Sequence, residues 1–521
     1  MTIYSHPGNA SITPRFGGGR CFYWPISLLF ILLVTAADCS KEISLPQEEI
    51  LARVGDRVIT VNEFIRRAEY AIRPAYCRQD NYIHRKIVLN TLIAEKLLAL
   101  EAGSDNDLAQ NAEFQAYIKG RQEQAMRQYF FYARAYKQAR PDTAELKKTY
   151  QLAGRTYQMH FVRLPDETSV AAFLKTQREQ NLPFDSLALD LAGGRHIPER
   201  QVSFNDDPSQ EFLNLFYSRP LEPGEQLGPM RNPDGTFLLL QVKGWTTRLA
   251  ITEQEAAQRW ENVHQRLTSL AAERQYIQEV ARLMRGKQMV FDEATFYELA
   301  ERLAPLYIKS RTDKEALFNQ QYWGEEIEIS PDSTSGQYLA AMGQRPFFTL
   351  DGQTWTVADF EKALDSHPLV FRQRNFSRRE FPAQFRLAVA DLMRDTYITR
   401  AAYRAGYDKV PAVRLYTAMW QDNLMALYQR NAYLKQAGFQ GESGRKNRNV
   451  IREQLNPYID RLQTRYSAVI EINFQAFEKI RLAAVDMVAM QKGVPYPLIT
   501  PAFPVLTTDD KLDYGRKMEA Q

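Results

Sequence analysis

The chain has 521 residues, of which 45% are hydrophobic and 25% charged, and this ordinary globular composition excludes a wholly disordered or fibrous protein. Lys and Arg number 66 against 62 Asp and Glu, so the net charge of +4 predicts no basic surface for nucleic acid. The three cysteines are too few for a disulfide framework or a four-cysteine zinc site, and the six histidines lack metal-ligand spacing. Because the GxxxxGK[ST] and GxGxxG phosphate loops are also missing, we expect neither a metal nor another cofactor.

The first 39 residues are typical of an export signal. Residues 1–37 contain no acidic residue, and two arginines precede an apolar run over 26–37. That run is shorter than the roughly 20 apolar residues of a membrane span. Cys39 stands where a bacterial lipoprotein carries its lipid, although Asp38 departs from that pattern. We therefore expect an exported protein of the periplasm or cell envelope, with a cleaved signal, a lipid on Cys39 and an uncleaved anchor as the alternatives.

Residues 48–140 are predicted to form a helical region. Thr60 and Glu63 have the spacing of a capping box, which places a helix start at the next residue after the threonine. Apolar residues recur every three or four positions over 83–102, as on one face of a helix, and a third helix is predicted over 111–138.

The pattern changes over 141–250. Alternating residues at 157–164 predict a strand, and a second strand is predicted over 236–242. Helices are expected between them over 169–180 and 184–191, so the segment has the order of a small α+β domain. Helix then resumes as a closing segment over 251–310, and 311–344 has the composition of a linker.

The helical pattern then occurs a second time. The matched segments are 58–64 with 354–360 and 92–98 with 392–398. A third helix is again expected, over 413–437, and a closing element follows it. We therefore predict a duplication, with a second helical region over 345–490 and a tail over 491–521. The two copies or their closing helices should share a core, because a helix with one apolar stripe cannot bury it alone. The alternative is two unrelated regions with generic helical spacing.

This organisation resembles the SurA/PrsA/PpiD-type envelope chaperones with parvulin-like peptidyl-prolyl isomerase domains. The motifs that carry the resemblance are Ala52-Arg-Val-Gly-Asp-Arg-Val-Ile-Thr-Val-Asn-Glu-Phe64 and Leu92-Ile-Ala-Glu-Lys-Leu-Leu-Ala-Leu-Glu-Ala102. They are followed by the α+β segment and by the return of helix. The resemblance implies a mainly α fold with an inserted α+β parvulin-like domain and duplicated helical chaperone-type regions.

Within 141–250 the resemblance also implies site residues. His160 stands where the family has its first histidine, and Phe237 replaces the second one. Asp190 is the nearest counterpart of the family's acidic or cysteine residue, which makes His160 and Asp190 the catalytic candidates. The apolar seat for a substrate proline would be formed by Phe212, Phe216 and Phe237. The plainer alternative is a hydrogen-bonded core histidine among core phenylalanines.

Proline isomerisation would need neither a nucleophile nor a metal. The barrier to peptide rotation is roughly 18–20 kcal/mol, and a dry, partly polar pocket can favour the twisted amide. In the family the two histidines face each other across adjacent central strands, and here the pair would be His160 and Phe237. Because an apolar ring cannot hydrogen-bond an imidazole, we expect isomerase activity to be weak or absent.

The resulting expectation is a cell-envelope folding factor for exported or outer-membrane proteins. Its partners would be unfolded or proline-containing exported polypeptides, with membrane contact through the signal or a lipid anchor. Aromatic residues at 129–132, Trp420, Tyr428 and Tyr433 would either offer an exposed client-binding surface or fill the helical core. The alternative function is a non-catalytic envelope scaffold or binding protein that reuses the fold.

Overall fold

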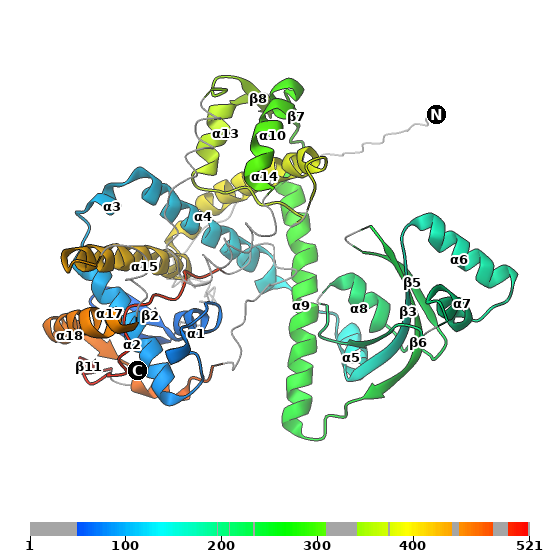
Figure 1. Ribbon diagram of the computed structural model, residues 1–521, viewed down its shortest axis with the longest axis horizontal. Helices are drawn as coiled ribbons and strands as arrows, with labels where there is room; N and C mark the ends of the chain where they lie inside the picture. Colours follow the sequence, from blue (N-terminus) through cyan, green and yellow to red (C-terminus); the bar gives the residue numbers. More distant parts are fainter. Residues whose placement is uncertain are drawn as a thin grey trace, which may run out of the picture. The chain divides into compact units, whose positions relative to one another are not determined.

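The computed structural model describes residues 49–194, 196–207, 209–232, 235–308, 341–373, 376–439, 448–482 and 499–518 (Figure 1). This part of the chain is mostly helical with several small sheets, as expected at that level. The expected export signal, Cys39 and most of the linker over 311–344 lie outside the described residues. Among the described helices none is long and apolar enough to cross a membrane.

The first helical region begins with a hairpin and continues in helices. Its elements are β1 (Ile50–Val54), β2 (Arg57–Thr60), α1 (Val61–Glu69), α2 (Tyr82–Ala102), α3 (Asp107–Gln110) and α4 (Ala112–Arg134). The hydroxyl of Thr60 accepts a hydrogen bond from the backbone N–H of Glu63 at 3.0 Å, so the predicted start of α1 is confirmed. At the end of α2, Gly103 adopts a φ of +66°, which a glycine tolerates without strain.

The second helical region repeats this order. Its elements are β8 (Pro346–Leu350), β9 (Gln353–Thr356), α13 (Val357–Leu364), α14 (Phe381–Arg404) and α15 (Pro411–Gln436). A capping box between Thr356 and Asp359 starts α13 after the hairpin, as Thr60 starts α1. Apart from the four-residue α3, both regions therefore have the order hairpin, short helix and two long helices, and the predicted likeness of helix order is confirmed.

Each hairpin is completed by a strand from the closing element of the other region. The strand β7 (Met289–Phe291) follows α9 (Glu253–Met284) and pairs with β8, whereas β10 (Ile470–Ile472) follows α18 (Asn456–Arg465) and pairs with β1. The remaining closing elements are α10 (Glu293–Tyr307), α17 (Arg448–Val450), α19 (Phe474–Lys479) and β11 (Arg516–Lys517). The two regions are thus interlocked through exchanged strands.

The long helices are interlocked in the same way. Helix α2 packs against α15, and α4 packs against α14, so the third helix of each region lies on the second helix of the other. One core joins α4, α9, α14 and α15, and it includes Phe130 and Trp420. The predicted shared core is therefore confirmed. For these two aromatic residues the core-filling alternative is correct, because both are buried.

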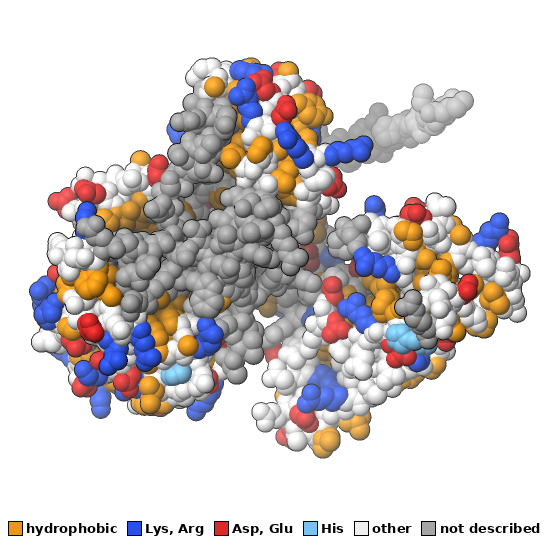
Figure 2. Space-filling model, viewed as in Figure 1, with side chains coloured by type: hydrophobic (Ala, Val, Ile, Leu, Met, Phe, Trp, Pro, Cys, Tyr) orange, Lys and Arg blue, Asp and Glu red, His pale blue; other side chains and the backbone are white. Residues whose placement is uncertain are grey.

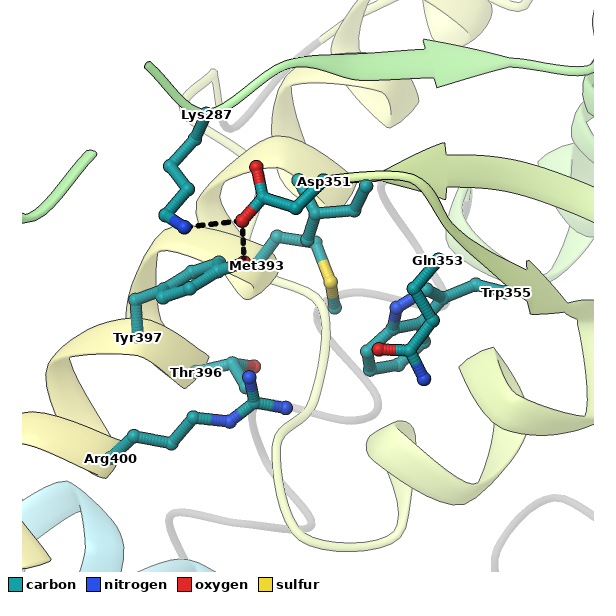
Figure 3. Close-up of a pocket in the computed structure, with 9 residues that line it drawn as sticks. Lys287, Asp351, Gln353, Trp355, Met393, Thr396, Tyr397 and Arg400 are labelled. Carbon is teal, nitrogen blue, oxygen red and sulfur yellow. Dashed lines mark hydrogen bonds and ion pairs between the residues drawn. The ribbon is translucent and has the colours of Figure 1, made fainter. Parts of the chain in front are cut away.

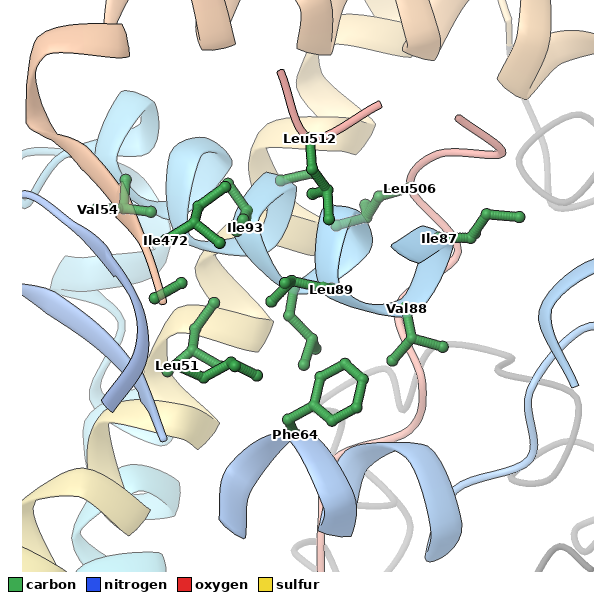
Figure 4. Packing of buried hydrophobic residues seen from close by; sticks show 14 of the residues in the cluster. Leu51, Val54, Phe64, Ile87, Val88, Leu89, Ile93, Ile472, Leu506 and Leu512 are labelled. Carbon is green, nitrogen blue, oxygen red and sulfur yellow. The ribbon is translucent and has the colours of Figure 1, made fainter. Parts of the chain in front are cut away.

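A second core surrounds the first hairpin (Figure 4). Leu51 and Phe64 meet Val88 and Leu89 of α2 there, and Ile472 reaches them from β10. The C-terminal segment joins this core with buried leucines at 506 and 512, so the expected tail is packed in its described part. Burying a leucine side chain contributes about 1.5–3 kcal/mol, so these two residues help to hold the segment on the core.

A buried network of charges crosses the contact between α2 and α15. The ammonium of Lys96 lies 3.1 Å from the carboxylates of both Glu63 and Asp422. Next to it, the guanidinium of Arg67 contacts the carboxylate of Glu95 at 2.7 Å, and the Asn423 amide donates to the same carboxylate. The network links three helices, α1, α2 and α15, that come from both regions.

The second region carries the counterpart of this network. Asp395 of α14 stands in the matched segment where α2 has Glu95. Its carboxylate faces the guanidinium of Arg127 on α4 at 3.8 Å and accepts from His367 at 3.1 Å. Burial would raise the pKa of Asp395, but His367, Arg394 and Arg127 outweigh it and hold the pKa below its usual value. Each contact between long helices therefore contains a buried carboxylate: Glu95 of α2 at the α2–α15 contact, and Asp395 of α14 at the α4–α14 contact.

The α+β domain lies between the first region and α9. Its elements are α5 (Thr143–Leu152), β3 (Arg155–Leu164), α6 (Glu167–Glu179), α7 (Phe184–Leu191), β4 (Glu199–Ser203), α8 (Gln210–Phe216), β5 (Gln226–Arg231) and β6 (Phe237–Thr247). The sheet is antiparallel in the order β4-β3-β6-β5. The predicted strands and helices are confirmed, but β4 and β5 were not predicted. Three of the five residues of β4 are exposed and polar, so it lacks the apolar alternation of a strand.

The two faces of this sheet carry separate cores. Tyr157 and Met159 of β3 belong to the core that receives α8 and the side chains Val263 and Leu267 of α9. Side chains alternate along a strand, so Val162 and Leu164 of β3 point to the other face of the sheet. There they pack against α6 and α7. Because α9 also contributes Ala272 and Tyr276 to the core of the helical regions, this one helix joins both parts of the molecule.

Candidate functional site

His160 lies on the central strand β3 and faces helix α7. Its side chain is buried, and its Nδ1 lies 2.6 Å from a carboxylate oxygen of Asp185. Its Nε2 lies 3.3 Å from the carboxylate of Glu199 on β4, which in turn pairs with Lys243 of β6 at 2.6 Å. The imidazole is therefore held between two carboxylates, both of which are about half exposed.

The charges around His160 form a short chain. The hydrogen bond from Lys243 and that from His160 hold the pKa of the Glu199 carboxyl below its usual value, so Glu199 is ionised. A carboxylate only accepts hydrogen bonds, and an imidazole donates from both nitrogens only when it carries both protons. Both contacts of His160 are thus hydrogen bonds in the imidazolium form, whereas a neutral ring makes only one of them.

Asp190 is not part of this site. It lies on α7 five residues after Asp185, about 140° round the helix at 100° per residue, and it is exposed. The prediction that Asp190 assists His160 is therefore wrong, and Asp185 takes that place. Asp185 was not predicted from the sequence, because no local pattern told which acidic residue of α7 turns toward β3.

The predicted apolar seat is divided between the two faces of the sheet. Phe212 and Phe216 of α8 are buried against each other, with ring centroids 4.9 Å apart, in the core that contains Tyr157 and Met159. His160 alternates to the opposite face of β3. Phe237 packs on that opposite face too. The prediction of one pocket formed by His160 and all three phenylalanines is wrong, because neighbouring residues of a strand point to opposite sides.

His160 and Phe237 share a face but do not face each other. In the β3–β6 ladder His160 lies opposite Gln241, and Phe237 lies opposite Leu164. The two positions are four residues apart along β3, roughly 13 Å along the ladder. The predicted contact between the imidazole and the phenyl ring is therefore wrong, and the polar partners of His160 come from α7 and β4 instead.

Glu199 and Lys243 were not predicted from the sequence. Glu199 belongs to the polar edge strand that gave no strand signal, and Lys243 follows the predicted end of β6. Within the described ranges no group of three or more His, Cys, Asp or Glu side chains is arranged to hold a metal ion. The site therefore presents a group of hydrogen-bonded charged side chains, around His160, next to the apolar core under α6 and α7.

A pocket of about 260 Å³ lies in the second helical region (Figure 3). Lys287, Asp351 and Tyr397 meet on one side of it, where the Asp351 carboxylate pairs with the ammonium and accepts from the Tyr397 hydroxyl at 2.8 Å. These hydrogen bonds hold the pKa of Asp351 below its usual value. Arg400 lies across the same tyrosine ring, with its guanidinium 5.5 Å from the centroid. The sequence singled out none of these residues.

Comparison of the chain with protein-family models, with curated proteins and with solved structures found no match.

Proposed function

We propose that the protein is an exported folding factor that binds unfolded or proline-containing polypeptides in the cell envelope, and that its α+β domain isomerises prolines weakly or not at all. The observation that carries the proposal is the set of partners around His160, whose ring nitrogens lie 2.6 and 3.3 Å from the carboxylates of Asp185 and Glu199. Phe237, where the family resemblance puts the second histidine, lies opposite Leu164 instead and offers no polar group.

Weak catalysis follows from what surrounds His160. Both ring nitrogens lie beside carboxylates, at 2.6 and 3.3 Å, and these carboxylates compete with a twisting amide for the imidazole. The phenyl rings of Phe212 and Phe216 lie on the other face of the sheet and cannot seat a proline beside it. If about 2–4 kcal/mol of transition-state stabilisation is missing, the rate falls roughly 30- to 1000-fold.

Polypeptide binding is supported by apolar side chains on the surface of the α+β domain. Leu189 and Leu191 of α7 are 39% and 58% exposed, and Leu249 and Ile251 before α9 are 70% and 86% exposed. Figure 2 shows apolar side chains on the visible face of this domain. Burial of such side chains against an unfolded chain is favourable and does not depend on a particular client sequence.

Two assays on the purified chain test the proposal. A protease-coupled proline-isomerisation assay should give a rate close to the uncatalysed one, unchanged in His160→Ala and in the control Asp190→Ala. An aggregation assay with a thermally unfolded protein should show suppression. Suppression should weaken in the double variant Leu189→Ser, Leu191→Ser, and it should persist in the exposed α6 control Lys175→Ser.

The outcomes separate the alternatives. Strong isomerisation that is lost in His160→Ala would contradict the weak-catalysis proposal and make His160 the working residue. A chain that neither isomerises proline nor suppresses aggregation, yet captures folded envelope proteins, would favour the non-catalytic scaffold.

A further inference from the structure

The outer edge of β10 is occupied by a strand of the chain itself. The C-terminal strand β11 pairs with β10 in parallel, with Glu471 opposite Arg516 and Ile472 opposite Lys517. Beyond the last pair, the N–H of Met518 donates to the carbonyl of Ile472 at 2.9 Å. This edge therefore binds an extended segment through main-chain atoms.

The strand β7 has the same geometry as β10. In β10, the N–H and C=O of Glu471 point toward the hairpin, where Glu471 lies opposite Arg53. The hydrogen bonds on either side set this alternation: the Gly55 N–H donates to the carbonyl of Val469, and the Asn473 N–H donates to the carbonyl of Leu51. In β7, the Asp292 N–H donates to the carbonyl of Phe347, and the Asp351 N–H donates to the carbonyl of Gln288. Val290 lies midway between these two bonds, so its own N–H and C=O point toward β8, as those of Glu471 point toward β1. In an antiparallel ladder the residues on either side of such a pair turn their N–H and C=O groups outward. For β7 those residues are Met289 and Phe291.

The outer edge of β7 carries no strand within the described residues, where the sheet has the order β7-β8-β9. Its counterpart sheet has the order β11-β10-β1-β2, with the additional strand at the matching edge. Val290 in the centre of β7 is 61% exposed, which is unusual for a valine in a strand. The edge therefore presents main-chain hydrogen-bonding groups next to an exposed apolar side chain.

We infer that the outer edge of β7 receives an extended segment of an unfolded polypeptide as a parallel strand, in the way that β10 receives β11. The C=O of Phe291 would accept from the incoming segment, as Ile472 accepts from Met518, and the N–H of Met289 would donate to it. Strand addition at a sheet edge uses main-chain atoms and so accepts many sequences.

An unfolded polypeptide is the occupant that fits this edge best. The incoming strand must be extended and have its own main chain free, which an unfolded chain supplies over many segments. Contact with Val290 favours apolar or β-branched side chains in that chain. The inference rests on the proposed polypeptide-binding function but places a binding site for it in the helical part, away from His160.

Hydrogen–deuterium exchange on the full chain tests the inference, with reduced and carboxymethylated α-lactalbumin as the unfolded probe. The amides of Met289 and Phe291 should exchange quickly in the free chain and at least tenfold more slowly when the probe is bound. The amide of Val290, which faces β8, should be protected in both states. Protection of Met289 and Phe291 without the probe would mean that another part of this chain or a second copy covers the edge, and would overturn the inference.

A variant at the edge gives a second measurement. Met289→Pro removes an outward N–H that the sheet does not use, so the β7–β8 pairing should persist. Its affinity for the probe should be about two- to tenfold weaker, as expected for one lost backbone hydrogen bond. The control Met289→Ala keeps the N–H and should bind as the original chain does.

Three further results would overturn the inference. Equal affinity of Met289→Pro and Met289→Ala is one of them. Probe binding without any change of exchange at β7 is another, and it leaves the proposed function standing with its binding site elsewhere. If the chain does not bind the probe at all, the proposed function fails together with the inference.

Discussion

Replacing Lys96 by methionine should destabilise the protein by about 3–5 kcal/mol, because it removes one charge from a buried network and leaves the others in place. The Lys96 side chain is only 1% exposed, and its ammonium lies 3.1, 3.1 and 3.7 Å from the carboxylates of Glu63, Asp422 and Glu95. Methionine has a similar volume and no charge, so the loss is electrostatic rather than a cavity effect.

The magnitude follows from the distances. At an effective dielectric constant of about 20, each of these contacts contributes roughly 5 kcal/mol of attraction, and desolvation of the ammonium offsets most of the sum. Burial alone would lower the pKa of Lys96, but Glu63, Asp422 and Glu95 outweigh it and hold the pKa above its ordinary value. The side chain is therefore charged, and its removal leaves three carboxylates facing fewer cations.

The assay is urea denaturation followed by circular dichroism at pH 8, with Lys119→Met as the matched control. Lys119 lies on the exposed surface of α4 and contacts Glu123 only at 3.9 Å, so its replacement should change stability by less than about 1 kcal/mol. A Lys96→Met protein within 1 kcal/mol of the original chain would refute the reasoning and show that the remaining carboxylates are compensated without Lys96.

The loss should also shrink as the pH falls from 8 toward the raised pKa of Glu63. Burial is the largest influence on Glu63 and raises its pKa, so the folded state takes up a proton before the unfolded state does. Acidification through that raised pKa therefore favours the folded state. The effect is larger in the Lys96→Met protein, because Lys96 lowers the pKa of Glu63 and no longer does so once it is replaced. Arg67 and Lys96 outweigh burial at Glu95 and lower its pKa, so its contribution is lost only as the pH falls below the unfolded value, near 4.5.

Three further substitutions, the last with a glycine control, test the fold. Asp395→Ala removes the carboxylate that faces the buried arginine of α4 and should cost about 3 kcal/mol in a urea titration, so a change below 1 kcal/mol would speak against that contact. Gly120→Ala should destabilise the helical part by at least about 2 kcal/mol, because the added Cβ would lie 2.1 Å from the carbonyl oxygen of Ser366, and an unchanged melting temperature would contradict it. Gly228→Ala should lower the melting temperature of the α+β domain, since Gly228 has a φ of +105°, whereas Gly244→Ala meets no atom within 4 Å and should be nearly neutral.

The sequence determined the local elements of this protein because their signals act over three or four residues. The spacing of Thr60 and Glu63 placed the start of α1, and the alternation at 157–164 placed β3. The matched segments gave the order of both helical regions, and with it the match of Glu95 to Asp395. Each of these features follows from capping or periodicity within one segment.

The tertiary structure alone decided how the segments meet. Ala52 pairs with Ile472, so the hairpin of the first region is closed by a strand from the far end of the chain. No local signal specifies that exchange, because both closing strands are short and both hairpins offer them an equivalent edge. At the site, the side chain that meets His160 was fixed by which residue of α7 turns inward, and Asp185 rather than Asp190 does so. Helix rotation and strand register depend on packing summed over many residues, and for that reason the place of His160 on β3 was predictable whereas its partners were not.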